Sequence, residues 1–97
     1  MGKLKVVSDR EEYAEVVKSA ISTEIKRLEI ALKRTEKEIR KYEDKYNVPS
    51  DVFVKKFGAE DLKGGDEEYI RWTGELKIKK RVLEDLQRLK NIKYVVN

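Results

Sequence analysis

The pattern of apolar positions in the first half of the chain predicts one long helix. Apolar or near-apolar residues recur there in alternating steps of four and three, which is the heptad spacing of a coiled-coil-like seam. The members of this seam are Ile21, Ile25, Leu28, Leu32, Thr35, Ile39, Tyr42 and Tyr46. No Gly or Pro interrupts residues 9–46, and Ser8 with Glu11 has the spacing of a capping box. We therefore predict a helix over about residues 9–46.

A short helix is predicted after the first long one. The segment Asn47-Val48-Pro49-Ser50 ends the long helix, because a residue that precedes proline is disfavoured in the α conformation. We expect a short helix over about residues 50–57, with Pro49 at its first position or Ser50 as its cap. Residues 58–65 are predicted to form a turn.

A second long helix is predicted over about residues 66–91, with Asp66 as its cap. Its large apolar residues spread over about 180° of the helix circumference. A hairpin partner alone covers a narrower stripe, so the pattern indicates a second covered surface. With the short helix, the predicted partner or oligomer interface comprises Tyr69, Trp72, Leu76, Ile78, Val82, Leu83, Leu86, Leu89, Phe53 and Phe57. We also expect three lysines of this helix, Lys79, Lys80 and Lys90, to meet glutamates that flank the first seam.

Together these elements predict a single all-α domain over residues 1–97. The predicted fold is a long, coiled-coil-like helical hairpin with a short connecting helix at its tip, assembled as an oligomeric helix bundle. The pattern leaves open whether the assembly is a dimer or a tetramer, and whether its helices run parallel or antiparallel. The tails, residues 1–8 and 92–97, are β-leaning in composition and either pair as a small ribbon or fray.

Six aromatic residues are predicted to lie near the tip of the hairpin. They are Tyr42, Tyr46, Phe53, Phe57, Tyr69 and Trp72. Aromatic residues at helical spacing usually form core, and we favour that interpretation. The alternative is an anchor set for a partner, because Tyr and Trp often dominate interface energetics.

The residue types that the chain lacks narrow its chemistry. It has no Cys and no His, which removes thiol catalysis, the commonest general base and the usual ligands of zinc. Acidic pairs such as Glu60/Asp61 and Glu67/Glu68 occur where turns and helix starts favour acids. We therefore expect no catalytic site, no metal site and no cofactor, and we predict that the chain is not an enzyme.

Charged residues make up 43% of the chain, against about a quarter in typical domains. A profile rich in Lys and Glu fits a heat-adapted organism. The net charge of +4 comes mostly from Lys3, Lys5 and Lys93 near the ends. One basic face is nevertheless a candidate nucleic-acid surface, comprising Lys26, Arg27, Lys33, Arg34, Lys37, Arg40 and Lys41. No aromatic residue interleaves with these residues for base stacking, so we favour a solvated face.

No apolar run approaches the roughly 20 residues that a membrane-spanning helix needs. The first seven residues also contain too short an apolar core for a secretion signal. We therefore expect a cytoplasmic location and no membrane partner.

Residues 45–57, Lys-Tyr-Asn-Val-Pro-Ser-Asp-Val-Phe-Val-Lys-Lys-Phe, are followed by an acidic, Gly-containing turn and then by Trp72 in a Leu-rich helix. Over about residues 30–90 this arrangement resembles a family of small helical proteins of archaea and cyanobacteria that are predicted to be antitoxins of toxin–antitoxin pairs. The family carries Tyr-Gly-Met-Ser where this chain has Tyr46-Asn47-Val48-Pro49. The resemblance implies a chain that binds and neutralises a cognate toxin enzyme without catalysis of its own.

The leading functional hypothesis is accordingly a non-catalytic protein-interaction module, antitoxin-like, that binds a partner through an apolar helix face and self-associates as a homo-oligomer. The alternatives are a nucleic-acid-binding helical hairpin that uses the basic face, and a purely structural coiled-coil oligomer.

Overall fold

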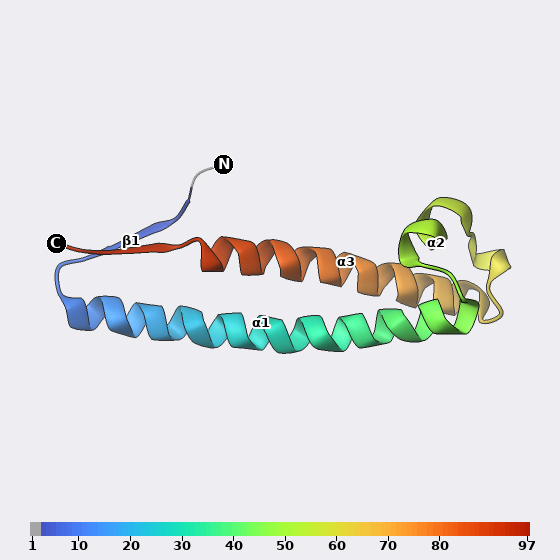
Figure 1. Cartoon of the computed structure of the whole chain (residues 1–97), viewed down its shortest axis with the longest axis horizontal. Coiled ribbons are helices and arrows are strands. Elements are labelled where there is room, and N and C mark those ends of the chain that lie inside the picture. Colours follow the sequence, from blue (N-terminus) through green and yellow to red (C-terminus); the bar gives the residue numbers. More distant parts are fainter. Residues whose placement is uncertain (1–2) are drawn as a thin grey trace. The chain divides into compact units, whose positions relative to one another are not determined.

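The computed structural model describes residues 3–97 and confirms the predicted helical hairpin, in which two long helices are joined through a short one (Figure 1). Its elements in chain order are β1 (Lys5–Ser8), α1 (Glu11–Tyr46), α2 (Ser50–Lys56), a 3₁₀ turn (Ala59–Asp61), α3 (Gly65–Lys90) and β2 (Lys93–Val96). Contacts within the chain gather into two compact units. The central unit is Leu32–Arg81, and the terminal unit comprises the chain up to Ala31 and from Val82 onward. Whether the two units form a single domain stays a prediction.

An aromatic stack forms the core of the central unit. Trp72 and Phe53 are both 0% exposed, and their rings stack at 3.7 Å between centroids with an interplanar angle of 2°. Tyr42 and Tyr46 of α1 stack near Trp72 at 5.7 and 6.0 Å. Through this stack Phe53 packs α2 against the two long helices. Leu62, which follows the 3₁₀ turn, is the third buried residue of the cluster. Phe53 and Trp72 are thus core, as we favoured from the sequence, and the other four aromatic residues pack half-buried against them.

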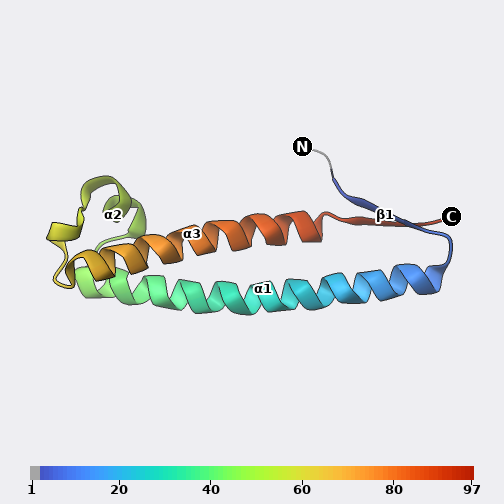
Figure 2. The same cartoon turned by 180° about the vertical axis from the view of Figure 1, so that it is seen from behind.

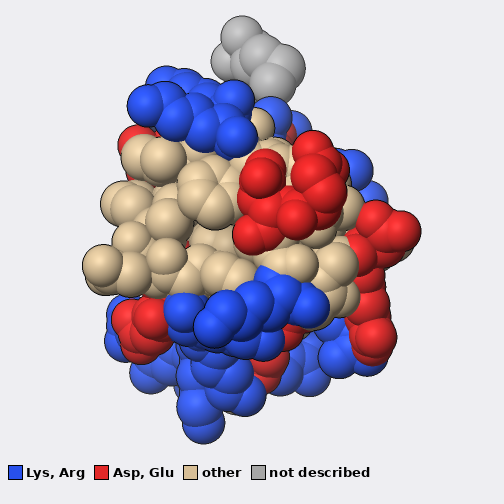
Figure 3. Space-filling model, turned by 90° about the vertical axis from the view of Figure 1, so that its right-hand side faces the viewer, with Lys and Arg blue, Asp and Glu red and all other residues tan. Residues whose placement is uncertain are grey.

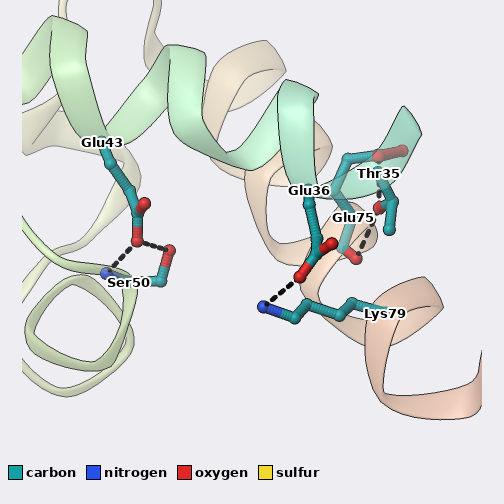
Figure 4. Close-up of polar contacts among 6 residues, drawn as sticks. All are labelled: Thr35, Glu36, Glu43, Ser50, Glu75 and Lys79. Carbon is teal, nitrogen blue, oxygen red and sulfur yellow. Dashed lines mark hydrogen bonds and ion pairs between the residues drawn. The ribbon is translucent and has the colours of Figure 1, made fainter. Parts of the chain in front are cut away.

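Two linked hydrogen bonds tie α2 to both long helices. The indole Nε1 of Trp72 donates to Ser50 Oγ at 3.0 Å, and Ser50 Oγ donates to Glu43 Oε2 at 2.8 Å. The backbone N–H of Ser50 donates to the same carboxylate oxygen at 2.9 Å (Figure 4). Because the first N–H groups of a helix have no partner within it, Glu43 satisfies a donor that α2 leaves open. Pro49 itself is the N-cap residue and has no side chain able to accept a hydrogen bond.

A buried hydroxyl fixes how α1 and α3 face each other in the central unit. Thr35, a seam residue, is 2% exposed, and its Oγ1 lies 3.1 Å from the backbone oxygen of Glu75 and 2.6 Å from the Glu75 carboxylate. Beside it Lys79 Nζ lies 3.5 Å from Glu36 Oε2 (Figure 4). This ion pair and the one between Lys90 and Glu29 in the terminal unit, also at 3.5 Å, confirm the expectation for two of the three lysines of α3. Lys80 is exposed, and within residues 3–97 no ion pair joins it to a glutamate that flanks the seam.

The two chain ends pair in the terminal unit, which settles the choice between a ribbon and fraying (Figure 2). β1 and β2 run parallel, with Val6 opposite Tyr94 and Val7 opposite Val95. The ribbon extends beyond the strands at one end, where the backbone N–H of Asn97 donates to Ser8 O at 2.8 Å.

Four predicted helix boundaries differ from the structure by one or two residues. One is the end of α3, which lies at Lys90 instead of residue 91. α1 begins at Glu11 instead of residue 9, because Ser8 is the last residue of β1, and the capping box predicted at Ser8 is therefore not the start of the helix. α3 begins at Gly65, whose φ of +61° suits a residue without a side chain, so Asp66 lies in the first turn and is not the cap. α2 ends at Lys56, one residue before the predicted end.

Substitution of Trp72 by Ala should lower the free energy of unfolding by about 3–5 kcal/mol, because it empties a fully buried site in a stacked core. Chemical denaturation followed by circular dichroism measures this loss. Val54→Ala is the matched control, since Val54 adjoins Phe53 in α2 but is exposed, and the change should stay within about 0.5 kcal/mol. Equal effects of the two substitutions would contradict the buried placement of Trp72.

Candidate protein-interaction site

The structure covers much of the predicted interface within the chain itself. Phe53, Trp72, Val82 and Leu86 are buried, so they belong to the core of this chain instead of presenting a surface to another. Four further members are half-buried, namely Phe57, Tyr69, Leu76 and Leu89. Only Ile78 and Leu83 of the predicted set are exposed. Around Trp72 the reason is that α2 packs over this part of α3 through Phe53.

A groove remains open on the central unit where α3 passes α1. Its volume is about 350 Å³. The lining residues are Glu38, Tyr42, Arg71, Gly74, Glu75 and Ile78. Tyr42 also stacks on Trp72, so the aromatic core supports this groove from beneath. A rigid floor of this kind favours a preformed binding surface.

Gly74 lies near the middle of α3, where it carries a cost for folding. A glycine in a helix interior destabilises the helix by about 1 kcal/mol relative to alanine. Apart from the nearby backbone of α3 itself, no atom of the described residues lies within 4 Å of the place where a Cβ would sit, so no neighbouring side chain excludes a larger residue there. Gly64 is different, because a Cβ at that position would overlap the side chain of Glu68. Gly74 therefore has no structural reason within the chain, and its open space faces the groove.

The apolar residues beside Gly74 are exposed. Ile70 and Ile78 precede and follow it by four residues, which places all three on one face of α3. Their exposed fractions are 66% and 48%. Two isoleucines on either side of a helix position without a side chain form a notch with apolar walls.

The charged residues that line the groove are engaged within the chain. Glu38 pairs with Lys41 at 3.0 Å. Arg71 pairs with Glu67 at 2.8 Å, and the carboxylate of Glu75 accepts from Thr35. The apolar part of the groove lining is therefore Tyr42, Gly74 and Ile78, and the charged side chains beside it are paired within the chain.

Sequence reasoning missed Gly74, although a signal for it was present. The apolar pattern of α3 identified the helix and its arc, and the glycine was passed over within it. An isolated glycine inside a helical pattern is tolerated there at a cost of about 1 kcal/mol relative to alanine, which makes its position worth examining. The predicted face also contained Ile78 but not Ile70, because Ile70 lies outside the arc centred on Trp72.

The seven residues of the basic face are all exposed. Some of their charge is used locally, since Arg27 pairs with Glu24 at 2.6 Å and Lys41 pairs with Glu38. The arginine holds the pKa of the Glu24 carboxyl below its usual value, mainly through the hydrogen bond between them. At the end of the molecule that carries α2, Lys and Arg alternate with Asp, Glu and uncharged surface (Figure 3). Neither sign dominates that end.

The terminal unit holds a larger hollow of about 580 Å³, next to the start of β1 and the end of α3. Leu4, Leu89 and Ile92 give it an apolar side. Arg88 on its rim is held by Glu84 at 3.6 Å and Asp85 at 3.1 Å, both on its own helix. Lys3 lines the hollow as well, so its lining combines apolar and charged side chains.

The acidic pairs have structural partners. Glu68 accepts from Lys45 Nζ at 2.6 Å and from the hydroxyl of Tyr46, and Asp61 accepts from the backbone N–H of Gly58 at 2.8 Å. Over residues 3–97, no three or more acidic, His or Cys side chains gather where they would hold a metal ion. Within the same residues no helix combines the length and hydropathy needed to span a bilayer.

Comparison of the chain with models of protein families, with curated proteins and with solved structures gives no match. The functional argument therefore depends on the residues of this chain.

Because of the pair of Lys45 and Glu68, we expect the stability of the central unit to depend on pH in the acidic range. The hydrogen bond from Lys45, and then that from Tyr46, hold the pKa of the Glu68 carboxyl below its usual value of 4.5. The stabilisation is complete above that ordinary pKa and is lost as the pH falls through the lowered value. Glu68→Gln should therefore show a smaller fall in Tm than the native chain between about pH 5 and pH 2.

Thermal unfolding across that range checks the expectation. Glu67→Gln is the control, because the neighbouring Glu67 is exposed and pairs only with Arg71 of its own helix. It should keep the acid dependence of the native chain. If Glu68→Gln and Glu67→Gln lose stability with acid to the same extent, the role given to Glu68 is wrong.

Proposed function

We propose that this chain is a non-catalytic protein-interaction module that binds an apolar segment of another protein in the groove at Gly74. The observation that carries the proposal is the glycine itself. It weakens α3, nothing within the chain requires it, and it opens space between two exposed isoleucines. A residue that costs stability without an internal reason is expected at a functional surface.

The groove fits the insertion of apolar side chains from a partner helix. Such recognition places residues spaced at i, i+3, i+4 and i+7 of the partner into an apolar groove. A volume of about 350 Å³ lies at the lower end of the range of about 300–1,000 Å³ for binding pockets. The missing side chain of Gly74 lets a partner approach the backbone of α3 closely.

The antitoxin-like role is the specific form of this proposal. It is supported by the resemblance of residues 45–57 and Trp72 to predicted antitoxins, and the groove supplies a surface for such a role. The partner would be a cognate toxin enzyme, a small ribonuclease-like or nucleotidyltransferase-like protein encoded beside this chain. Neutralisation would require binding only.

Nucleic-acid binding by α1 is the second candidate function, because all seven Lys and Arg residues of the basic face are exposed. Fluorescence anisotropy with labelled single-stranded and duplex oligonucleotides tests it. Binding that weakens steeply with added salt would support this candidate, since phosphate contacts release counterions. An absence of binding at low salt would eliminate it.

Substitutions at Gly74 separate its effect on the stability of the chain from its role in binding a partner. We expect Gly74→Ala to raise the free energy of unfolding by about 1 kcal/mol, because alanine is the better helix former and its Cβ meets open space. We expect Gly74→Leu to fill the notch and lower the affinity for the partner at least about tenfold. The affinity would be measured by calorimetry with the purified protein encoded at the neighbouring locus.

Lys80→Ala is the matched control, because Lys80 is exposed on α3 and does not line the groove. It should leave the affinity unchanged. Equal affinity of the native chain and the folded Gly74→Leu variant would overturn the groove as the binding site. No binding of the neighbouring protein by the native chain would overturn the antitoxin-like form of the proposal.

A further inference from the structure

A second heptad stripe runs along the outside of α1, away from the seam that faces α3. Its steps of three and four match those of the inner seam, displaced around the helix. The members are Tyr13, Val16, Ala20, Thr23, Arg27 and Ile30. All six are exposed and belong to the terminal unit, and the exposed fractions of Val16 and Ile30 are 68% and 70%. Two large aliphatic side chains are thus held in water on one face.

The middle of this stripe is poor in charge. Residues 13–23 contain only two charged residues, Glu15 and Lys18, in a chain that is 43% charged. The hydroxyl of Thr23 donates to the backbone oxygen of Ser19 at 3.1 Å, so its hydrogen bond is already made within α1. Depletion of charge with small and apolar residues at the centre is the composition of an interface core.

The charges on either side of this centre have opposite signs. Residues 9–17 contain four acids and one base, a net charge of −3, and residues 26–34 contain four bases and one acid, a net charge of +3. The two segments lie at equal distances from the midpoint between Ala20 and Thr23. A second α1 laid antiparallel across this midpoint would therefore meet acid with base at both ends.

We propose that two copies of this chain associate through the outer stripe of α1, antiparallel about a two-fold axis between Ala20 and Thr23. Tyr13 of one copy then lies beside Ile30 of the other, and Ala20 lies beside Thr23. The small residues at the centre let the helices approach closely. The same patch serves both copies, as a two-fold interface requires. A parallel pairing would instead place like charges together at each end.

This dimer goes beyond the proposed function, because it uses α1 of the terminal unit and leaves the groove at Gly74 unoccupied. It also differs from the oligomer interface expected from the sequence, which lay on α3. The two ideas can fail separately.

Sedimentation equilibrium of the native chain should show a dimer. Ala20→Arg should raise the dissociation constant at least about 100-fold, since it places two like charges together at the axis, while arginine keeps the helix intact. Leu83→Arg is the control, because Leu83 is exposed on α3 in the same unit. It should remain dimeric with unchanged helix content.

The orientation is tested by cross-linking, which is simple in a chain without cysteine. Tyr13→Cys and Ile30→Cys should each stay largely uncross-linked alone and form a disulfide-linked heterodimer when mixed. Two cysteines need Cα atoms within about 7 Å to bridge. Cross-linking of Tyr13→Cys with itself would show a parallel pair and overturn the proposal. A native chain that stays monomeric at about 1 mM, or an Ala20→Arg variant that stays dimeric, would overturn it as well.

Discussion

The central unit depends on the burial of one indole ring, that of Trp72. A tryptophan can be fully buried at little cost only when its N–H has a partner, and here that partner is Ser50. Ser50 can accept only if α2 begins immediately after Pro49, and Glu43 of α1 holds it in place by accepting from both its hydroxyl and its backbone. One buried donor thereby links α1, α2 and α3. Pro49, which ends α1, and the carboxylate of Glu43, which accepts from the start of α2, both position the hydroxyl of Ser50 for Trp72.

The elements could be predicted from the sequence because each depends on local information. The heptad steps from Ile21 to Tyr46 identify α1, and Pro49 sets its end. The partners across the hairpin depend instead on how far one helix is shifted along the other. Glu43 lies one residue from the seam position Tyr42, yet its carboxylate accepts from the start of α2 and from no lysine of α3 in the described residues. Thr35 was placed on the seam correctly, but its bond to Glu75 requires a register that no local pattern encodes.

The width of the apolar arc on α3 was not enough to predict which apolar residues stay exposed for a partner. The arc is wider than the stripe that one antiparallel helix covers, so a second covering surface was expected from another chain. In the structure α2 covers part of the remaining arc, because Phe53 stacks on Trp72 and contacts Tyr69. On the part of α3 that belongs to the central unit, the exposed large apolar residues are Ile70 and Ile78. Ile78 was part of the predicted arc and Ile70 was not, so the arc alone did not identify the apolar residues that stay exposed.

The helix stability that is lost at Gly74 can be compared with the stability that the nearby buried core supplies. A small domain has only about 5–15 kcal/mol of net stability, so a loss of about 1 kcal/mol in one helix is a sizeable fraction. The stacked core at Trp72 lies one turn or less from Gly74, and its full burial offsets that loss in the same helix. The strongest packing in the chain therefore adjoins its weakest helix position. A groove opened by a glycine stays well shaped only when the floor beneath it is rigid, and Tyr42, stacked on Trp72, provides that floor.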